Sequence, residues 1–271
     1  VDPRGAAMCL GSLLILVVIL SASPGAADKA PTALRGAGAQ IDQVLVFDAG
    51  SSGTRIHVFN IAPAGDPTKA HVPRIDLSVR PEQTYKVKPG LSSFAEREDL
   101  PGVQKNIEEL VKFADNFVPK DRRATTPALL KATAGLRSVP QFKAQAVLQR
   151  IRETLSATGY RVEPEWVDII KGKEEGGLAW VAANYLQGTF GEEGGGAAGK
   201  SVGVIEMGGG STQVTFEVPA SVQLATDDEF VFETALGRRY RLYAHSYLGY
   251  GQDHAQTSLA SSLPGAAGED P

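Results

Sequence analysis

Cysteine is nearly absent from this chain of 271 residues, and histidine is scarce. The single cysteine, Cys9, lies within an apolar run near the N-terminus, so no disulfide bond can form within the chain. The four histidines and the cysteine show none of the spacings that are typical of structural zinc sites. The sequence therefore excludes a small domain held together by disulfides, and it gives no indication of a zinc module.

An excess of positive charge and a Walker A motif are also missing. The chain has 27 basic and 31 acidic residues, a formal net charge of −4, whereas proteins that bind nucleic acids usually carry a basic excess. No Gly-x-x-x-x-Gly-Lys-Ser/Thr segment occurs, which excludes the common phosphate-binding loop. With 42% hydrophobic and 21% charged residues, the composition is that of a globular protein with one large domain or two smaller ones.

One long apolar run is present, over residues 6–22, with Arg4 before it and small residues after it. About 17 apolar residues is the lower limit for a membrane span, so the run predicts an uncleaved signal anchor or a cleaved signal peptide. A buried core helix is the third interpretation. We expect residues 1–40 to form this segment and a Gly/Pro/Ala-rich stalk. The rest of the chain would then be extracellular or in the lumen of the Golgi or endomembrane system, and secreted if the segment is cleaved.

Beyond residue 41, short β-type runs alternate with stretches of helical periodicity, a pattern typical of an α/β sheet. The runs around the first Gly/Ser turn predict a hairpin, and so does the segment from Val202 to Glu217. We expect further strands at Leu129–Ala132 and Val167–Ile170. We expect helices at Gln104–Phe117, Pro140–Thr158 and Glu174–Leu186.

The two predicted hairpins carry matching turns. In residues 44–55 and again in residues 202–213, an apolar strand is followed by an acid, a glycine two positions later and a small-residue turn that includes a threonine. Such turns expose backbone N–H groups that bind phosphate, and glycine permits close approach. The hydroxyls of Ser51, Ser52, Thr54, Ser211 and Thr212 add donors. Asp48 and Glu206 are placed to hold the water shell of Mg²⁺ or Ca²⁺. A plain hairpin turn remains the alternative for either turn taken alone.

Two other stretches are candidates for the site. Lys131–Arg137 follows a predicted strand, and Arg137 is either a phosphate clamp or an ordinary surface arginine. Glu174 and Glu175 open a predicted helix, where acids often serve only the helix dipole and the cap. A carboxylate directed at an attacking water would instead be a general base.

Together these stretches resemble four conserved regions of the ecto-nucleoside triphosphate diphosphohydrolases, or apyrases, in the family's order. They are residues 48–55, 131–137, 172–186 and 206–213; Tyr243–Gly251 also resembles a stretch that follows the fourth region. The second hairpin resembles some plant-type members, which carry glutamate at the position of Glu206, where the family usually has aspartate. The chain ends before the fifth region, so we expect a fragment or C-terminally truncated product.

The resemblance implies an actin-like, ribonuclease-H-like fold of two duplicated lobes with the nucleotide between them. Residues 41–165 would form the first lobe, and residues 166–271 an incomplete second lobe with a disordered tail. Glu175 would be the base that activates water, and Asp48 and Glu206 would organise Ca²⁺ or Mg²⁺ through its waters. Ser211 and Gln213 would help to place the nucleophilic water. The phosphate-binding set would be Asp48, Gly50, Ser51, Ser52, Gly53, Thr54, Arg55, Thr133, Arg137, Gly208, Gly209, Gly210, Ser211, Thr212 and Gln213.

The function that the resemblance implies is metal-dependent hydrolysis of the terminal phosphates of nucleoside tri- and diphosphates. Two alternatives remain. An exopolyphosphatase of the same superfold also pairs an acid-Gly-Ser turn with an acid-Gly-Gly-Gly-Ser-Thr turn. A truncated chain could also bind nucleotide without turnover. The sequence does not distinguish a base preference or a preference for triphosphates over diphosphates.

Overall fold

The computed structural model describes residues 43–61, 83–190, 200–234 and 238–262. The predicted anchor and stalk (residues 1–40) lie outside these ranges. None of the helices within these ranges combines the length and the apolar character that crossing a membrane requires.

The first sheet has five strands in the order β3-β2-β1-β4-β5. β1 (Gln43–Ala49) pairs antiparallel with β2 (Thr54–Asn60), which confirms the first hairpin, and β3 (Thr84–Val87) extends it. β4 (Ala128–Ala132) and β5 (Val167–Ile169) run parallel to β1. β1 is buried on both faces, because Leu45 and Phe47 belong to one hydrophobic cluster and Val44 and Val46 to another. That double burial explains its continuous apolar sequence.

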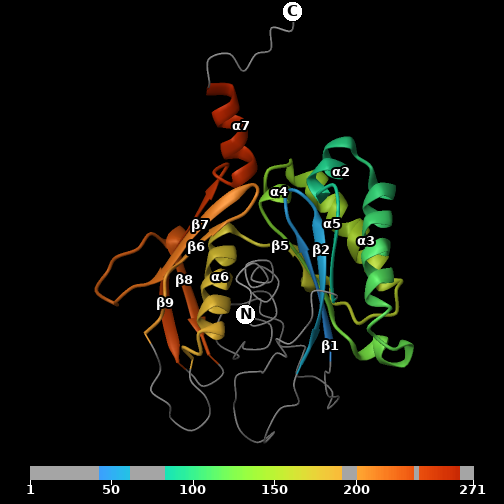
Figure 1. Ribbon diagram of the computed structural model, residues 1–271, viewed down its shortest axis with the longest axis horizontal. Helices are drawn as coiled ribbons and strands as arrows, with labels where there is room; N and C mark the ends of the chain where they lie inside the picture. Colours follow the sequence, from blue (N-terminus) through green and yellow to red (C-terminus); the bar gives the residue numbers. More distant parts are fainter. Residues whose placement is uncertain (1–42, 62–82, 191–199, 235–237, 263–271) are drawn as a thin grey trace, which may run out of the picture.

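Helices α2 (Leu91–Arg97), α3 (Leu100–Ala114) and α5 (Gln141–Ser156) pack on one face of this sheet (Figure 1). The single turn of α4 (Ala134–Arg137) follows β4 directly. Two 3₁₀ segments complete this half, η3 (Lys120–Thr125) and η4 (Pro164–Trp166). α3 begins where Asp99 accepts a hydrogen bond from the N–H of Gly102 at 2.8 Å, which caps the helix N-terminus.

The second sheet has the order β6-β7-β9-β8 and is antiparallel throughout. Its strands are β6 (Val204–Met207), β7 (Ser211–Glu217), β8 (Glu229–Glu233) and β9 (Arg239–Leu248); η5 (Thr226–Asp228) precedes β8. Helix α6 (Gly172–Leu186) packs on this sheet and faces the first sheet (Figure 1). A hydrophobic cluster that includes Trp166, Trp180 and Tyr240 joins the two halves.

Two predicted boundaries are wrong. Residues 167–169 form β5 of the first sheet, because they pair in parallel with β4, so the first half extends to about Ile170 rather than to residue 165. The expected disordered tail is helical over α7 (Gln252–Ser262), which projects from the body in Figure 1. The start of α7 is held by hydrogen bonds from the N–H groups of Gln252 and Asp253 to Gly208 O and Gly209 O. Residues 263–271 lie outside the described ranges.

The burial of His57 on β2 leads to a prediction about how stability depends on pH. Its ring is buried, stacks on Phe59, and lies with Nδ1 2.8 Å from Thr84 Oγ1. Burial, with the charge of Arg55 as the smaller cause, lowers the pKa of His57 from 6.5 to about 3. The folded state therefore holds a neutral ring, while the unfolded chain takes up a proton below pH 6.5. We expect His57 to reduce the free energy of unfolding as the pH falls from 6.5 towards 3, by at most roughly 4 kcal/mol.

Urea unfolding of the wild type and of His57→Leu across this pH range would measure that contribution. The variant should show a shallower loss of stability with acid. Parallel curves for the two proteins would contradict the prediction.

Candidate functional site

The two glycine-rich turns are built alike and lie against each other. In the first, the N–H of Gly50 donates to Gly53 O at 3.1 Å; in the second, the N–H of Gly208 donates to Ser211 O at 3.0 Å. A methyl group on Gly209 would lie 2.4 Å from Ser51 Oγ, so the turns approach closely only because residue 209 has no side chain. The predicted facing of the two turns is thus present in the structure.

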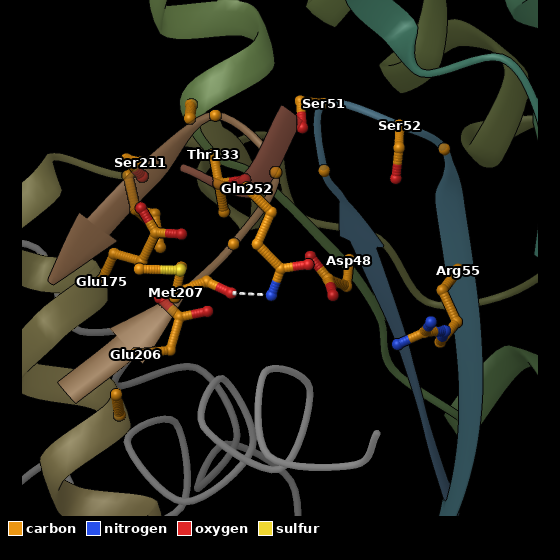
Figure 2. Close-up of a pocket in the computed structure, with 18 of the residues that line it drawn as sticks. Asp48, Ser51, Ser52, Arg55, Thr133, Glu175, Glu206, Met207, Ser211 and Gln252 are labelled. Carbon is orange, nitrogen blue, oxygen red and sulfur yellow. Dashed lines mark hydrogen bonds between the residues drawn. The ribbon is translucent and has the colours of Figure 1, made fainter. Parts of the chain in front are cut away.

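Between and below the turns lies a cavity of about 430 Å³. Figure 2 shows Glu175, Glu206 and Ser211 on one wall, and Asp48, Ser52 and Arg55 on the opposite wall. Thr133 also lines the cavity. The predicted residues that line it are Asp48, Gly50, Ser51, Ser52, Gly53, Arg55, Thr133, Glu175, Glu206, Gly208, Gly209, Gly210 and Ser211.

The first turn of α6 separates the roles of two adjacent acids. Glu174 accepts a hydrogen bond from the N–H of Lys171 at 2.8 Å and so belongs to a capping arrangement at the helix N-terminus. Glu175 instead faces the cavity. The start of α6 is pressed against β9, since a methyl group on Gly172 would lie 2.3 Å from Ser246 Cβ. The backbone thus fixes which of the two carboxylates reaches the site.

Glu175 is held by one arginine and one amide. Arg137 Nη1 lies 2.7 Å from Glu175 Oε2, and Gln213 Nε2 donates to the same oxygen at 3.0 Å. Arg137 also donates to Ser211 Oγ at 3.1 Å, and Gln213 donates to Ser211 Oγ at 2.7 Å and Ser246 Oγ at 3.0 Å. Because α4, α6, β7 and β9 each supply a member, the carboxylate is oriented by the packing of both halves of the molecule. Arg137 is a clamp on Glu175 and not a surface side chain.

Three carboxyl groups share this cavity, and burial is the largest cause that raises the pKa of each. Burial raises the pKa of Glu206 to about 7, and the charges of Glu175 and Asp48 add to it. Burial also raises the pKa of Asp48, against the nearby charges of Arg55 and Lys86. The pKa of Glu175 is raised by burial and by the charge of Asp48, and Arg137 opposes the rise. Such clustered, desolvated acids are characteristic of functional sites.

The acids on the two strand ends suit a hydrated divalent cation. Glu206 Oε2 is buried and has no hydrogen-bond partner among the described residues, and Asp48 faces it across the cavity. No group of three or more His, Cys, Asp or Glu side chains within the described ranges could bind a metal directly. Two carboxylates with few other protein ligands match Mg²⁺, which keeps several of its waters, and an oxygen donor set also suits Ca²⁺.

Several predicted phosphate ligands do not reach the cavity. Successive strand residues face opposite sides, so Thr54 points into the core of the first half and is fully buried. Thr212 points to the other face of its sheet and donates to Tyr250 O at 2.6 Å. Gly50 and Gly208 do line the cavity, but their N–H groups donate to carbonyl groups of their own turns. Arg137 and Gln213 do not line the cavity, but both donate hydrogen bonds to Glu175 and Ser211.

Some site residues carry no sequence motif. Lys86 on β3 and Gln252 at the start of α7 line the cavity, as do the apolar side chains of Ile170 and Leu178. Ser246 on β9 completes the hydrogen bonds of Gln213. The resemblance of the stretch around Ser246 to the family was the only signal for that residue. Lys86 and Gln252 depend on long-range pairing that a local pattern does not reveal.

The fold is the α/β, actin-like fold. A crystal structure of nucleoside triphosphate hydrolases from Neospora caninum superposes with a TM-score of 0.55 and 23% sequence identity, over 78% of this chain and 45% of that one. The chain belongs to the GDA1/CD39 (nucleoside phosphatase) family, whose model matches residues 39–268.

Relatives from animals and plants match about equally well. A mouse protein named ectonucleoside triphosphate diphosphohydrolase 6 is 36% identical over 253 residues, 92% of this chain and 50% of the relative. An Arabidopsis thaliana protein named probable apyrase 4 is 37% identical over 224 residues, 82% of this chain and 42% of the relative. The chain thus spans about half the length of these relatives, and the matches assign it to the family rather than to a plant-type branch.

Proposed function

We propose that this chain catalyses divalent-metal-dependent hydrolysis of the terminal phosphates of nucleoside tri- and diphosphates, using a water activated by Glu175. The observation that carries the proposal is the placement of Glu175: a buried carboxylate, oriented by Arg137 and Gln213, on a cavity bounded by two glycine-rich turns. Phosphoryl transfer needs an aligned water and neutralised charge more than covalent chemistry, and this site offers both.

The residues divide the work by position. Glu175 takes a proton from the water as the water oxygen forms a bond to the terminal phosphorus. The bond from that phosphorus to the bridging oxygen breaks, and the shortened nucleotide leaves as an anion. The hydroxyl of Ser211, which lines the cavity and accepts a hydrogen bond from Gln213 Nε2, is the group available to orient the water. A cation held by Asp48 and Glu206 through its waters would neutralise phosphate charge.

The family supports the proposed substrate class, since the names of the similar proteins refer to nucleoside triphosphates and to apyrase. An inorganic polyphosphate offers the same terminal phosphate to the same turns. Hydrolysis of nucleotides but not of long-chain polyphosphate would favour the nucleotidase over the exopolyphosphatase.

The test is release of inorganic phosphate from ATP and UDP by the purified chain. We expect turnover with Mg²⁺ or Ca²⁺ and at least a hundredfold less after chelation, because two or more uncompensated phosphate charges would face Asp48 and Glu206. Binding of a methylene-bridged nucleotide analogue is measured in parallel. Binding without turnover in the presence of either metal would support a silent nucleotide-binding protein instead.

We propose further that residues 6–22 attach the chain to a membrane, with the site on the extracellular or luminal side. The support is the length and position of the apolar run. In cells, resistance to extraction at alkaline pH would support an anchor. Recovery of a shortened chain from the medium would support a cleaved signal, and a cytosolic, carbonate-soluble chain would contradict both.

A further inference from the structure

Lys86 lies on the cavity wall opposite Glu175. Its Nζ donates to Ser52 Oγ at 3.0 Å, and Figure 2 shows Ser52 across the cavity from Glu175. The stem of the lysine lies over the first turn, because a methyl group on Gly53 would be 2.6 Å from Lys86 Cε. Gly53 therefore makes room for β3 and its lysine. The arrangement brings an ammonium group to the same turn that carries the phosphate-binding hydroxyls.

Burial and the charges of Arg55 and Lys88 lower the pKa of Lys86, and the charges of Asp48 and Asp253 oppose part of that shift. Arg55 on β2 and Lys86 on β3 are directly opposite in the register, so their side chains share one face of the sheet. Like charges directly opposite each other destabilise a strand pair. Within the described part of the chain Lys86 forms no ion pair, and Lys88 adds a further positive charge nearby. Two neighbouring cations on one wall of a cavity favour the binding of an anion there.

The direction from which the water attacks indicates which phosphate group lies near Lys86. In phosphoryl transfer the attacking and leaving oxygens lie roughly in line through phosphorus. A water activated by Glu175 attacks from the Glu175 wall, so the bridging oxygen that leaves must point to the opposite wall. That wall carries Ser52, Arg55 and Lys86.

We propose that Lys86 binds the leaving phosphate, the one attached to the bridging oxygen, and stabilises the negative charge that develops there as the bond breaks. The proposal rests on the proposed function for the position of the attacking water. It assigns to β3 a phosphate contact that adds to those of the two glycine-rich turns. This contact requires a phosphoanhydride, with or without a nucleoside.

The first test is binding by calorimetry in the presence of Mg²⁺, with methylene diphosphonate and orthophosphate as the probes. Lys86→Gln should weaken binding of the diphosphonate about tenfold, as expected for loss of one charge-assisted hydrogen bond. Orthophosphate fills only the position of the reacting phosphate, so the variant should bind it less than about threefold more weakly than the wild type does. Lys88→Gln is the matched control, because it removes the same charge from the same segment at a residue that does not line the cavity. It should change the dissociation constant of neither the diphosphonate nor orthophosphate by more than about threefold.

Two further readings separate a binding role from a structural one. The unfolding temperature of Lys86→Gln should be equal to or above that of the wild type, because a like-charge pair is removed. The kcat for UDP should fall about tenfold or more, since the contact strengthens in the transition state. If Lys86→Gln weakened the binding of both probes equally, or did not weaken the binding of the diphosphonate, the proposal would be overturned. A wild type that binds the diphosphonate through Lys86 but releases no phosphate would refute the proposed function and leave the phosphate contact standing.

Discussion

Glu175→Gln should lower the kcat for nucleotide hydrolysis by about a thousandfold, within the range that general-base catalysis contributes, while nucleotide binding changes little. The amide has nearly the shape of the carboxylate but cannot accept a proton from water. It retains an oxygen that can accept from Arg137 Nη1, the contact that Glu175 makes at 2.7 Å. Phosphate release from UDP with Mg²⁺, together with binding of a methylene-bridged analogue, measures the two effects separately.

Glu174→Gln is the matched control, because it changes the neighbouring acid of the same helix turn. Glu174 accepts from the N–H of Lys171 at the helix start, and glutamine fills that capping position as well. Its kcat should stay within about threefold of the wild type, since the cap contributes to the helix and not to the reaction. If the two variants lost activity equally, the assignment of the base to Glu175 would fail.

The local sequence pattern was sufficient to predict the two turns and the strands and helices next to them. The acid-glycine-serine sequence after an apolar strand predicted both hairpins, and a four-residue β-type run predicted β4. Periodicity located α3, α5 and α6 within a few residues of their observed ends. These signals depend on neighbours in the chain, and so they can be seen in the sequence.

The features that the sequence did not predict depend on pairing between segments that are distant in the chain. The assignment of residues 167–169 to the first sheet is set by parallel pairing with β4, and the strands β8 and β9 were not identified as strands at all. Lys86 enters the site because β3 pairs with β2 across a long connection. Thr54 and Thr212 were assigned to phosphate because they close the turns, but strand alternation turns them away. Site residues within the two glycine-rich turns are therefore more visible in sequence than Lys86 and Ser246, which distant strands bring to the site.

The choice between Glu174 and Glu175 illustrates the difference. Both are acids in the first turn of one helix, and composition and spacing treat them alike. Only the hydrogen bonds from Lys171 to Glu174 and from Arg137 to Glu175 separate the helix cap from the proposed general base. The resemblance to the apyrases chose the same residue, but the physical reason is the direction in which each side chain leaves α6.

Arg137→Met should lower activity at neutral pH about a hundredfold and shift the acid limb of the kcat/KM profile to higher pH, on the scale of mutations that misplace a catalytic group. Arg137 lowers the pKa of Glu175 against the effect of burial, so its removal raises that pKa further. The base acts only when it is deprotonated, and a higher pKa therefore reduces the active fraction at any pH below it. The arginine also donates to Ser211 Oγ, so the water-binding side of the site loses its support.

The stability of Arg137→Met tests whether the ion pair with Glu175 contributes more than the packing of the arginine side chain. Both side chains are largely buried, at 14% and 15% exposure, and Arg137→Met leaves Glu175 without its cation. Loss of one partner of a buried pair costs about 3 kcal/mol when the other stays charged. The cost should be larger at pH 8 than at pH 5, because protonation neutralises the stranded carboxyl at the lower pH. Arg137→Lys, which keeps the charge but loses the planar fork that spans Glu175 and Ser211, should recover most of the stability at pH 8 and only part of the activity. A methionine variant whose acid limb coincides with that of the wild type would show that Arg137 does not set the protonation of the base.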